Sequence, residues 1–440
     1  MFKILFFIFS FLFIANGIAQ DIPNSAMVEQ TSSQLYISKN WEELIKYGNT
    51  AITHGVDYYY LRFRIGVASY EQKKYRNAAS HFEKALEFNS DDSLSLEYLY
   101  YSYVFSGRNN EARALTSMFS TTLRDKIKPP GNKYIESVYA EGGFAPCNLN
   151  DKFKNIDINA PSNIYGEATI TNLMQYWHIG LNHQLGNKTS IYQGYSNIKI
   201  DMTRKINTNN KDTVDNYSLA QHDYYISAIH QFKHFSLSPA IHLIRVGFGK
   251  LNANYDIINS KYLFKKKDTS FVNFATSLSI IKNIGIYTFN LSPGFSRLNG
   301  FTQLQTGLSL AYYPVTSTNF YGSSSIIYLN ENNTSRIIAA QKLGIKIIPK
   351  LWGEAEITIG NLQNYCENNA FVVFNTGDKI IYKYGLAITS PLLKHVEFSL
   401  RYECFNRENT YYRTNDLYKM ESVNINYNTQ TIIGGIKWKL

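Results

Sequence analysis

From residue 133 to the C-terminus, apolar and polar residues alternate one by one in a series of short stretches. In the last stretch, Thr431 to Leu440, the even positions carry apolar or small side chains, whereas Lys437 and Lys439 take the odd positions. A period of two places successive side chains on opposite faces of a β-strand. Strands with one apolar and one polar face are typical of transmembrane β-barrels. The pattern therefore predicts that residues 133–440 form an antiparallel transmembrane β-barrel.

The alternating stretches predict about 14 strands, and 12 to 16 are compatible with the pattern. They lie at 134–145, 170–185, 190–205, 217–232, 235–251, 270–282, 285–297, 301–314, 319–329, 336–348, 351–361, 379–391, 395–406 and 423–440. Short links alternate with longer polar loops, which are predicted at 206–216, 252–269, 330–335, 362–370 and 406–423. Two places depart from this rule: the link 298–300 is short for an outer loop, and 147–169 has room for another hairpin.

The same alternation indicates which charged side chains point into the lumen. The residues expected there are Lys199, Asp201, Lys342, Lys346, Glu354, Glu356, Glu397, Arg401 and Glu403. Charges of both signs in a confined space favour ion pairs. Two interpretations stay open: an interior held in shape by salt bridges, or a polar conduit whose charged walls select a solute.

Residues 25–126 repeat with a period of 34, the spacing of tetratricopeptide (TPR) helix-turn-helix units. The middle unit, 59–92, has small and large residues at the positions where two helices pack. Three units are about the minimum that can bury a continuous core, so this short α-helical solenoid should lean on the barrel or on a partner. A groove for a periplasmic protein would use Tyr58, Tyr59, Arg62 and Arg64, which could equally be ordinary packing positions.

A targeting segment precedes the helical region, and a linker separates that region from the barrel. Residues 1–19 read as a signal peptide, with Lys3 before an apolar core and a small-x-small cleavage pattern. Residues 127–132 contain two consecutive prolines, which cannot continue a helix. This order predicts a bacterial outer-membrane protein with its helical module in the periplasm.

Composition adds little chemistry to this picture. The net charge of +10 is spread over the whole chain, which argues against a nucleic-acid partner and is compatible with attraction to anionic lipopolysaccharide. Contacts of the outer loops with lipid, lipopolysaccharide or polysaccharide would use Lys265, Lys266, Lys267, Arg407, Tyr411, Tyr412 and Arg413. The three cysteines are an odd number without CxxC spacing, so neither a disulfide framework nor a metal site is predicted.

An enzymatic role finds no motif in this sequence. HExxH, GxSxG and a phosphate-binding glycine loop are all absent from the chain. His178, His222, His230 and His242 fall on strands, where a histidine could orient a serine nucleophile. We expect no catalytic residue, no cofactor and no metal, and we read these histidines as residues of the lumen or of the membrane interface.

The order of signal, helical repeats, Pro-Pro-Gly linker and barrel, ending in Gly434-Gly435-Ile436-Lys437-Trp438-Lys439-Leu440, resembles the YaiO-type outer-membrane barrel family. Some members carry N-terminal TPR repeats, and the terminal Leu departs from the usual Phe. The same order resembles outer-membrane components of exopolysaccharide secretion. The leading hypothesis is a non-enzymatic barrel with a periplasmic docking module, serving as a port or anchor for export or display of an envelope polysaccharide. The alternatives are an assembly factor anchored by the barrel and, third, a lipid- or glycan-modifying enzyme.

Overall fold

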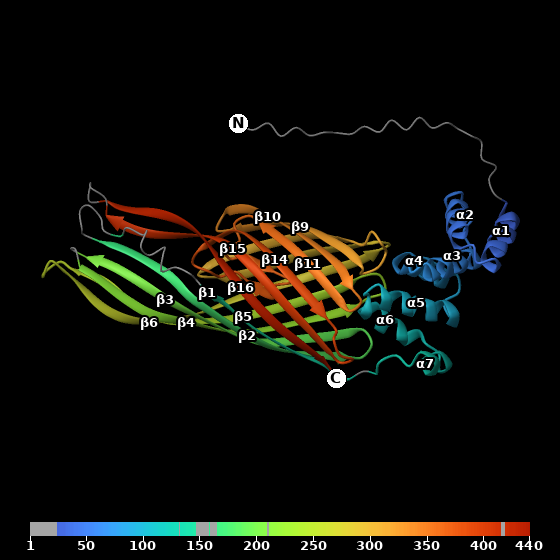
Figure 1. Ribbon diagram of the computed structural model, residues 1–440, viewed down its shortest axis with the longest axis horizontal. Coiled ribbons are helices and arrows are strands. Elements are labelled where there is room, and N and C mark those ends of the chain that lie inside the picture. The colour runs from blue at the N-terminus through green and yellow to red at the C-terminus, as the bar shows by residue number, and fades with distance from the viewer. Residues whose placement is uncertain (1–23, 132, 147–157, 159–164, 209–210, 415–418) are drawn as a thin grey trace, which may run out of the picture.

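The computed structural model describes residues 24–440 except 132, 147–157, 159–164, 209–210 and 415–418. It shows a helical module at one end of a closed β-barrel (Figure 1). The signal segment and the region 147–164, apart from Ile158, lie outside the described residues, so the expectations for them keep the status of predictions. No helix among the described residues has the length and apolar character needed to cross a membrane.

The helical module repeats at the predicted spacing. The described part contains α1 (Ser25–Ile37), α2 (Trp41–Thr53), α3 (Tyr59–Glu71), α4 (Tyr75–Phe88), α5 (Ser93–Phe105), α6 (Asn109–Leu115), the 3-10 turn η1 (Thr116–Met118) and α7 (Thr121–Ile127). Helices α1, α3 and α5 begin 34 residues apart, and so do α2, α4 and α6. The period of 34 is thus a period of helix pairs, whereas membership of the TPR class stays a prediction.

Small residues set the distance between neighbouring helices. A Cβ atom on Gly48 of α2 would lie 2.5 Å from the Ile65 side chain of α3, and one on Gly66 would lie 2.8 Å from Phe82 of α4. Phe82 has no exposed surface and packs among Val67, Leu96 and Leu99. Close approach of the helices buries these apolar side chains, which stabilises the module.

Fourteen antiparallel strands close the barrel in the described part of the chain, as the alternation predicted. They are β1 (Ile135–Pro146), β2 (Gly166–Leu185), β3 (Thr189–Thr208), β4 (Lys211–Gln231), β5 (Ser236–Asp256), β6 (Lys261–Ile284), β7 (Tyr287–Leu298), β8 (Phe301–Tyr312), β9 (Phe320–Glu331), β10 (Thr334–Ile348), β11 (Leu351–Ile359), β14 (Lys379–Ser390), β15 (Val396–Thr414) and β16 (Met420–Lys439). Neighbours in sequence pair throughout, and β1 pairs with β16 to close the ring.

Large apolar side chains cover the outside of the barrel. Trp177, Ile326, Leu386 and Trp438 are between 47% and 62% exposed, and they alternate with side chains that point inward. Exposed apolar surface of this extent is unfavourable in water and favourable in lipid. The barrel is therefore a membrane-spanning one.

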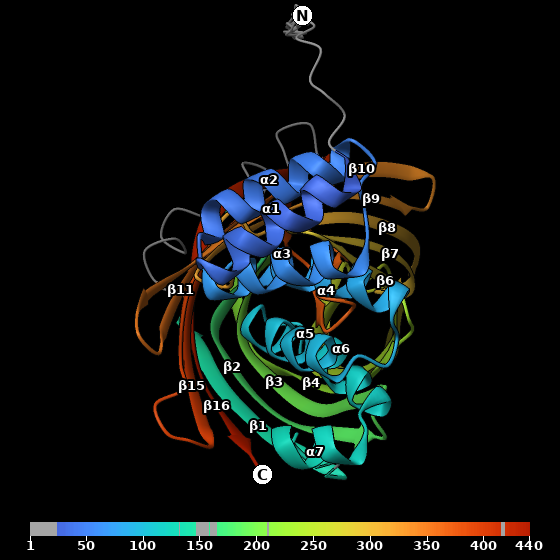
Figure 2. The ribbon, with the colours of Figure 1, turned by 90° about the vertical axis from the view of Figure 1, so that its right-hand side faces the viewer.

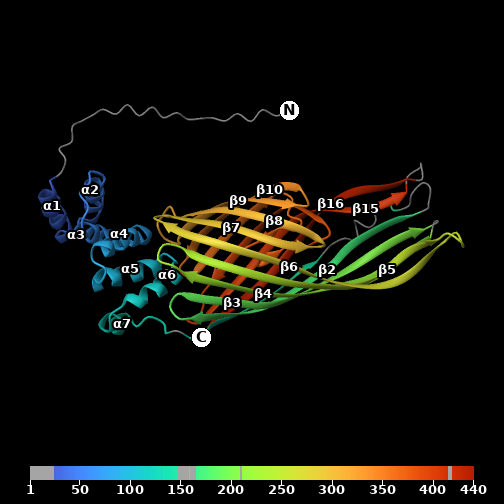
Figure 3. The same ribbon diagram turned by 180° about the vertical axis from the view of Figure 1, so that it is seen from behind.

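The barrel wall differs in height around its circumference. Strands β2 to β6 have 20 to 24 residues, whereas β7, β8 and β9 have 12 each. The long strands run past the short ones at the end far from the helices, together with β15 and β16 (Figures 1 and 3). We call this the far end, and the opposite one the helix-side end.

Four of the predicted outer loops are wrong in their length. Strand ladders run through most of 206–216, 252–269, 330–335 and 406–423, and the turns at 257–260 and 332–333 are short. Both faces of a strand meet polar surroundings beyond the lipid, so polar residues there do not mark the end of the ladder. The link at Asn299 and Gly300 is a two-residue turn in which both φ angles are positive.

The helical module docks on the short turns at the helix-side end. Arg76 lies 3.4 Å from the ring centroid of Tyr313, its backbone N–H donates to the carbonyl of Thr316 at 3.1 Å, and its guanidinium donates to Thr288 at 3.3 Å. Arg113 of α6 contacts Gln184 and Glu136. Helices α4 to α6 lie across the mouth when the barrel is viewed along its axis (Figure 2). The short module therefore leans on the barrel.

Candidate functional site

The segment between β11 and β14 folds into the barrel instead of standing outside it. We call residues 360–378 the lumen segment; it forms the two-stranded hairpin of β12 (Cys366–Glu367) and β13 (Val372–Val373). Leu362, Tyr365 and Phe374 pack against inward side chains of the wall, such as Leu329 and Phe405. The prediction of an outer loop at 362–370 is therefore wrong. Its apolar residues need a covered environment, which the inward side chains of the wall provide.

The tip of the hairpin is fixed by polar contacts to several strands. Asn368, Asn369 and Ala370 have φ angles of 51°, 57° and 62°, a left-handed conformation that is costly for Ala. Asn369 accepts a hydrogen bond from Tyr225 at 3.1 Å and donates to the carbonyl of Ser238 at 3.1 Å. Such contacts on β4 and β5 hold a backbone that would otherwise relax.

Further along, Gln305 of β8 binds the backbone of Cys366 twice. Its side-chain amide donates to the carbonyl at 2.7 Å, and its carbonyl oxygen accepts from the N–H at 3.1 Å. Phe371 packs edge-on against the rings of His178, Tyr192 and Tyr225. The hairpin thus bridges opposite walls of the barrel.

One charged group ties the lumen segment to the wall. Lys383 of β14, whose side chain is only 3% exposed, lies 2.7 Å from Glu367 of the hairpin and 3.1 Å from Glu356 of β11. Lys342 extends this chain of charges, with its Nζ 3.5 Å from Glu356 and 3.6 Å from Glu354. Lys383 is the buried member of this network, and its removal would leave Glu367 without its cation, which is destabilising.

The lumen segment separates two cavities of different chemistry. The larger has a volume of about 460 Å³ and lies toward β1 to β4 and β14 to β16; we call it the charged chamber. Its described lining includes seven carboxylate side chains and four lysine or arginine side chains: Glu141, Asp223, Glu354, Glu356, Glu367, Glu397 and Glu403, with Lys342, Lys383, Arg401 and Arg407. A third cavity, of about 400 Å³ at the helix-side mouth, shares Glu354, Thr389 and Glu397 with the charged chamber. The chamber therefore extends to the mouth beneath the helices.

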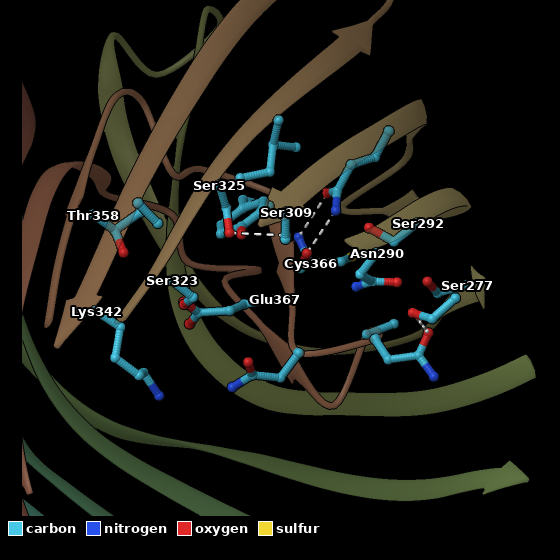
Figure 4. Close-up of a pocket in the computed structure, with 18 of the residues that line it drawn as sticks. Ser277, Asn290, Ser292, Ser309, Ser323, Ser325, Lys342, Thr358, Cys366 and Glu367 are labelled. Carbon is cyan, nitrogen blue, oxygen red and sulfur yellow. Dashed lines mark hydrogen bonds between the residues drawn. The ribbon is translucent and has the colours of Figure 1, made fainter. Parts of the chain in front are cut away.

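The smaller cavity, about 150 Å³, lies on the other side of the hairpin toward β6 to β9. Hydroxyl and amide side chains line it: Ser277, Ser279, Asn290, Ser292, Gln305, Ser309, Ser323 and Ser325. Figure 4 shows the serines around Cys366 and Glu367 of the hairpin. Sequence reasoning missed this wall because serine is common on polar faces, yet the repeated choice of serine at inward positions of four successive strands was a visible signal.

Seven of the nine expected lumen residues lie inside. Glu354, Glu356, Glu397, Arg401, Glu403 and Lys342 line the charged chamber. Arg401 lies between Glu141 and Glu403, at 3.6 Å and 3.5 Å. Lys346 shares the face of Lys342, and its ammonium lies 5.0 Å from the ring centroid of Trp352 near the helix-side end.

Lys199 and Asp201 are wrong as lumen residues. Ser196, Ile198 and Ile200 of the same strand line the charged chamber, so Lys199 and Asp201 face outward, where they form an ion pair at 3.4 Å. At this height the outer face is polar and the inner face is partly apolar, which reverses the rule used within the lipid belt.

The residues expected in outer loops lie in strands. Lys265, Lys266 and Lys267 belong to β6 and pair with Asn252, Leu251 and Lys250 of β5. Arg407, Tyr411, Tyr412 and Arg413 belong to β15, where Arg407 lines the charged chamber and Tyr411 is buried beside Ala168. These residues therefore belong to the long strands that extend to the far end of the barrel. Their contacts with lipopolysaccharide or polysaccharide stay a prediction.

The four residues expected in a docking groove make contacts with different helices of the module, and the groove itself stays a prediction. Arg64 pairs with Glu29 of α1 at 2.6 Å, whereas Arg62 pairs with Asp57 at 2.7 Å and lies near His81 of α4. Tyr58 packs between α1 and α2, and Tyr59 stacks on Phe63. All four take part in contacts within the module. The guanidinium of Arg62 also holds the pKa of Asp57 below its usual value.

The four histidines fall into two groups: His178 and His242 are buried on the inner face, beside Phe371 and Tyr225 respectively, and His222 and His230 lie elsewhere. His178 points inward, with Nδ1 2.8 Å from Ser196 and Nε2 2.5 Å from Tyr192. His222 contacts Tyr195 on the outer face, and His230 contacts Thr189 near the helix-side turns. Phe371 covers the Ser196–His178 pair, and the second ring nitrogen of His178 contacts the hydroxyl of Tyr192. Among the described residues no group of three or more His, Cys, Asp or Glu side chains is arranged to hold a metal.

No protein-family model and no curated protein matches this chain. Solved barrels are similar at low identity. A FadL homologue of Pseudomonas aeruginosa has a TM-score of 0.44 at 9% identity, covering 77% of this chain and 94% of its own. The toluene transporter TodX of Pseudomonas putida has a TM-score of 0.42 at 7% identity, covering 74% and 92%. Likeness at this level concerns the form of the barrel and says nothing about substrate. Membership of the YaiO-type family therefore stays a prediction from the sequence.

Proposed function

We propose that this protein is a non-enzymatic outer-membrane pore for small solutes, whose lumen segment acts as its gate. The observation that supports it best is the lumen segment itself, which crosses the interior and depends on Lys383 for its charged attachment. A gate must close the lumen stably and still be displaceable, and a hairpin joined to the wall at both ends meets both needs. The apolar belt and the predicted signal peptide support the outer-membrane location, and the docked helices are proposed to face the periplasm.

A small solute fits the interior better than a polymer does. The charged chamber holds about 460 Å³, which is in the range of pockets for small molecules. The hairpin would have to leave the lumen completely before a polysaccharide chain could pass. Export of an envelope polysaccharide therefore gains no support from the lumen.

Planar-bilayer recording tests the proposal on the full chain. Wild type should be closed for most of the time, and a variant in which residues 363–376 are replaced by a short Gly-Ser linker should conduct steadily. Replacement of the turn 257–260 by the same linker is the matched control, because that turn joins β5 and β6 at the far end, outside the lumen. A silent hairpin-deleted barrel would refute the pore and favour the alternative, an anchor whose helical module binds a periplasmic protein.

A further inference from the structure

Two buried side chains of the charged chamber each have one polar atom without a hydrogen-bond partner among the described residues. Asp223 of β4 and His242 of β5 both line the chamber, and their side chains are 6% and 5% exposed. Asp223 Oδ2 lies 3.8 Å from His242 Nε2. Buried polar groups are nearly always paired, so each exception calls for an explanation.

The protons of this pair can be assigned from its partners. His242 Nδ1 lies 2.8 Å from the carbonyl of Ala370, which can only accept, so Nδ1 carries the hydrogen. In the neutral ring Nε2 is then an acceptor, and it has no partner among the described residues. Asp223 Oδ2 accepts from Gln221 at 3.0 Å, whereas Oδ1 has no partner there either. With Asp223 ionised, acceptor atoms of the two side chains thus lie near one another, and no described residue supplies a donor to Asp223 Oδ1 or His242 Nε2.

A cation with several N–H donors matches these acceptor atoms best. A primary ammonium can donate to Oδ1, to Oδ2 and to Nε2 at once, and its charge compensates the buried carboxylate. The chamber favours a cation overall, because carboxylates outnumber lysine and arginine side chains in its lining. A neutral donor would leave that excess uncompensated.

The other residues that line the chamber indicate what kind of molecule would carry this ammonium group. Met174, Ile198, Ile200 and Phe371 line the same chamber, and the Phe371 ring packs against Tyr225, which in turn contacts the His242 ring. Apolar side chains and an aromatic ring beside a cation site favour an organic cation over a hydrated metal ion.

We infer that the charged chamber is a binding site for a small primary amine with an apolar body, whose ammonium lies between Asp223 and His242. The site goes beyond the proposed pore, because binding requires no conduction. If the proposed pore is also correct, the site identifies small amines as the class of solute that the pore would admit.

Calorimetric titration of the full chain in detergent tests the inference with 2-phenylethylammonium as the probe. We expect binding by wild type, and at least about tenfold weaker binding by Asp223→Asn, since a charge-assisted pair is lost. Asp201→Asn is the control, because Asp201 lies on the outer face. Equal binding by Asp223→Asn and wild type, or no binding by wild type, would overturn the inference and leave water as the occupant.

Two further probes keep the test independent of the variant's folding. On wild type, 2-phenylethanol has the same body without the charge, and the N,N,N-trimethyl derivative has the charge without N–H donors. Both should bind at least about tenfold more weakly than the primary amine. If the alcohol binds equally well, charge is irrelevant; if the trimethyl derivative does, the donor argument is wrong. Binding without conduction in the bilayer experiment would reject the pore and keep the site.

Discussion

At the scale of single residues, Lys383 has the strongest influence on how the lumen segment is held to the barrel wall. Its ammonium is nearly inaccessible and pairs with carboxylates of both the wall and the lumen segment. Its long side chain places the charge where neither carboxylate would be stable alone. A neutral side chain of similar size therefore removes the cation of Glu367 and leaves Glu356 with Lys342 as its cationic partner.

We predict that Lys383→Met loosens the lumen segment without dismantling the barrel. The readout is the reaction of Cys366, which lies in the hairpin, with a maleimide in a background of Cys147→Ser and Cys404→Ser. The rate should rise at least about tenfold, because loss of one partner of a buried pair costs about 3–5 kcal/mol. Lys379→Met is the control, since Lys379 forms a more exposed pair with Glu408. Equal rates in the two variants would show that the ion pairs do not hold the hairpin.

The alternation of apolar and polar residues assigned individual side chains to the lumen correctly only where the outer face of the strand must be apolar. Within the lipid belt one face must be apolar, so Glu354, Glu356 and Arg401 could be assigned to the lumen from alternation alone. Above the belt both faces meet polar surroundings, and Lys199 was assigned to the wrong face. Asp223 and His242 could not be paired in advance, because their approach depends on the register between β4 and β5.

At the scale of elements, the helices and the strands were predictable because each kind carries a period. Helix pairs recur every 34 residues, and strands alternate every two, so both follow from local sequence. The lumen segment carries no period. Its apolar residues, including Leu362, Tyr365 and Phe374, were the available signal of a buried segment, since large apolar side chains are uncommon in a water-exposed loop.

The helical module should lose stability as the pH falls below neutrality. Burial, and next the neighbouring Arg62, lower the pKa of His81 in α4 from 6.5 to about 4. The unfolded chain therefore binds a proton in this range while the folded module does not, so the stability is complete above pH 6.5 and declines as the pH approaches 4. The loss reaches up to about 3 kcal/mol.

Circular dichroism at 222 nm, followed during heating of the full chain, measures this effect. His81→Gln should flatten the pH dependence of the helical transition between pH 6.5 and 4.5. His54→Gln is the control, because His54 lies at the exposed end of α2. A wild-type transition with no pH dependence in this interval would contradict the lowered pKa of His81.

At the scale of the whole molecule, the barrel and the module are joined through a few buried contacts. Arg76 is 2% exposed although it belongs to a surface helix, because the turn around Tyr313 and Thr316 covers it. A cation over an aromatic ring that is shielded from water is worth about 2 kcal/mol. The orientation of the module over the mouth therefore depends on this side chain.

We predict that Arg76→Ala loosens the module at this contact with the barrel while both parts stay folded. Hydrogen exchange should become about tenfold faster in peptides covering residues 74–79 and 313–319, the two sides of the contact. Lys84→Ala, at an exposed position of α4, should leave both peptides unchanged. Faster exchange throughout α4 would mean instead that the module itself had lost stability.

The contact at Arg76 also constrains the order of events in assembly. Arg76 and Thr288 are 212 positions apart, and Thr316 lies further along still. The helices leave the ribosome first, yet the turns that receive them are completed only after β7, β8 and β9 have paired. The helical module, although it is made earlier, therefore cannot reach its place before these strands have paired. Until then its barrel-facing side, including Arg76, is open to whatever accompanies the chain to the membrane.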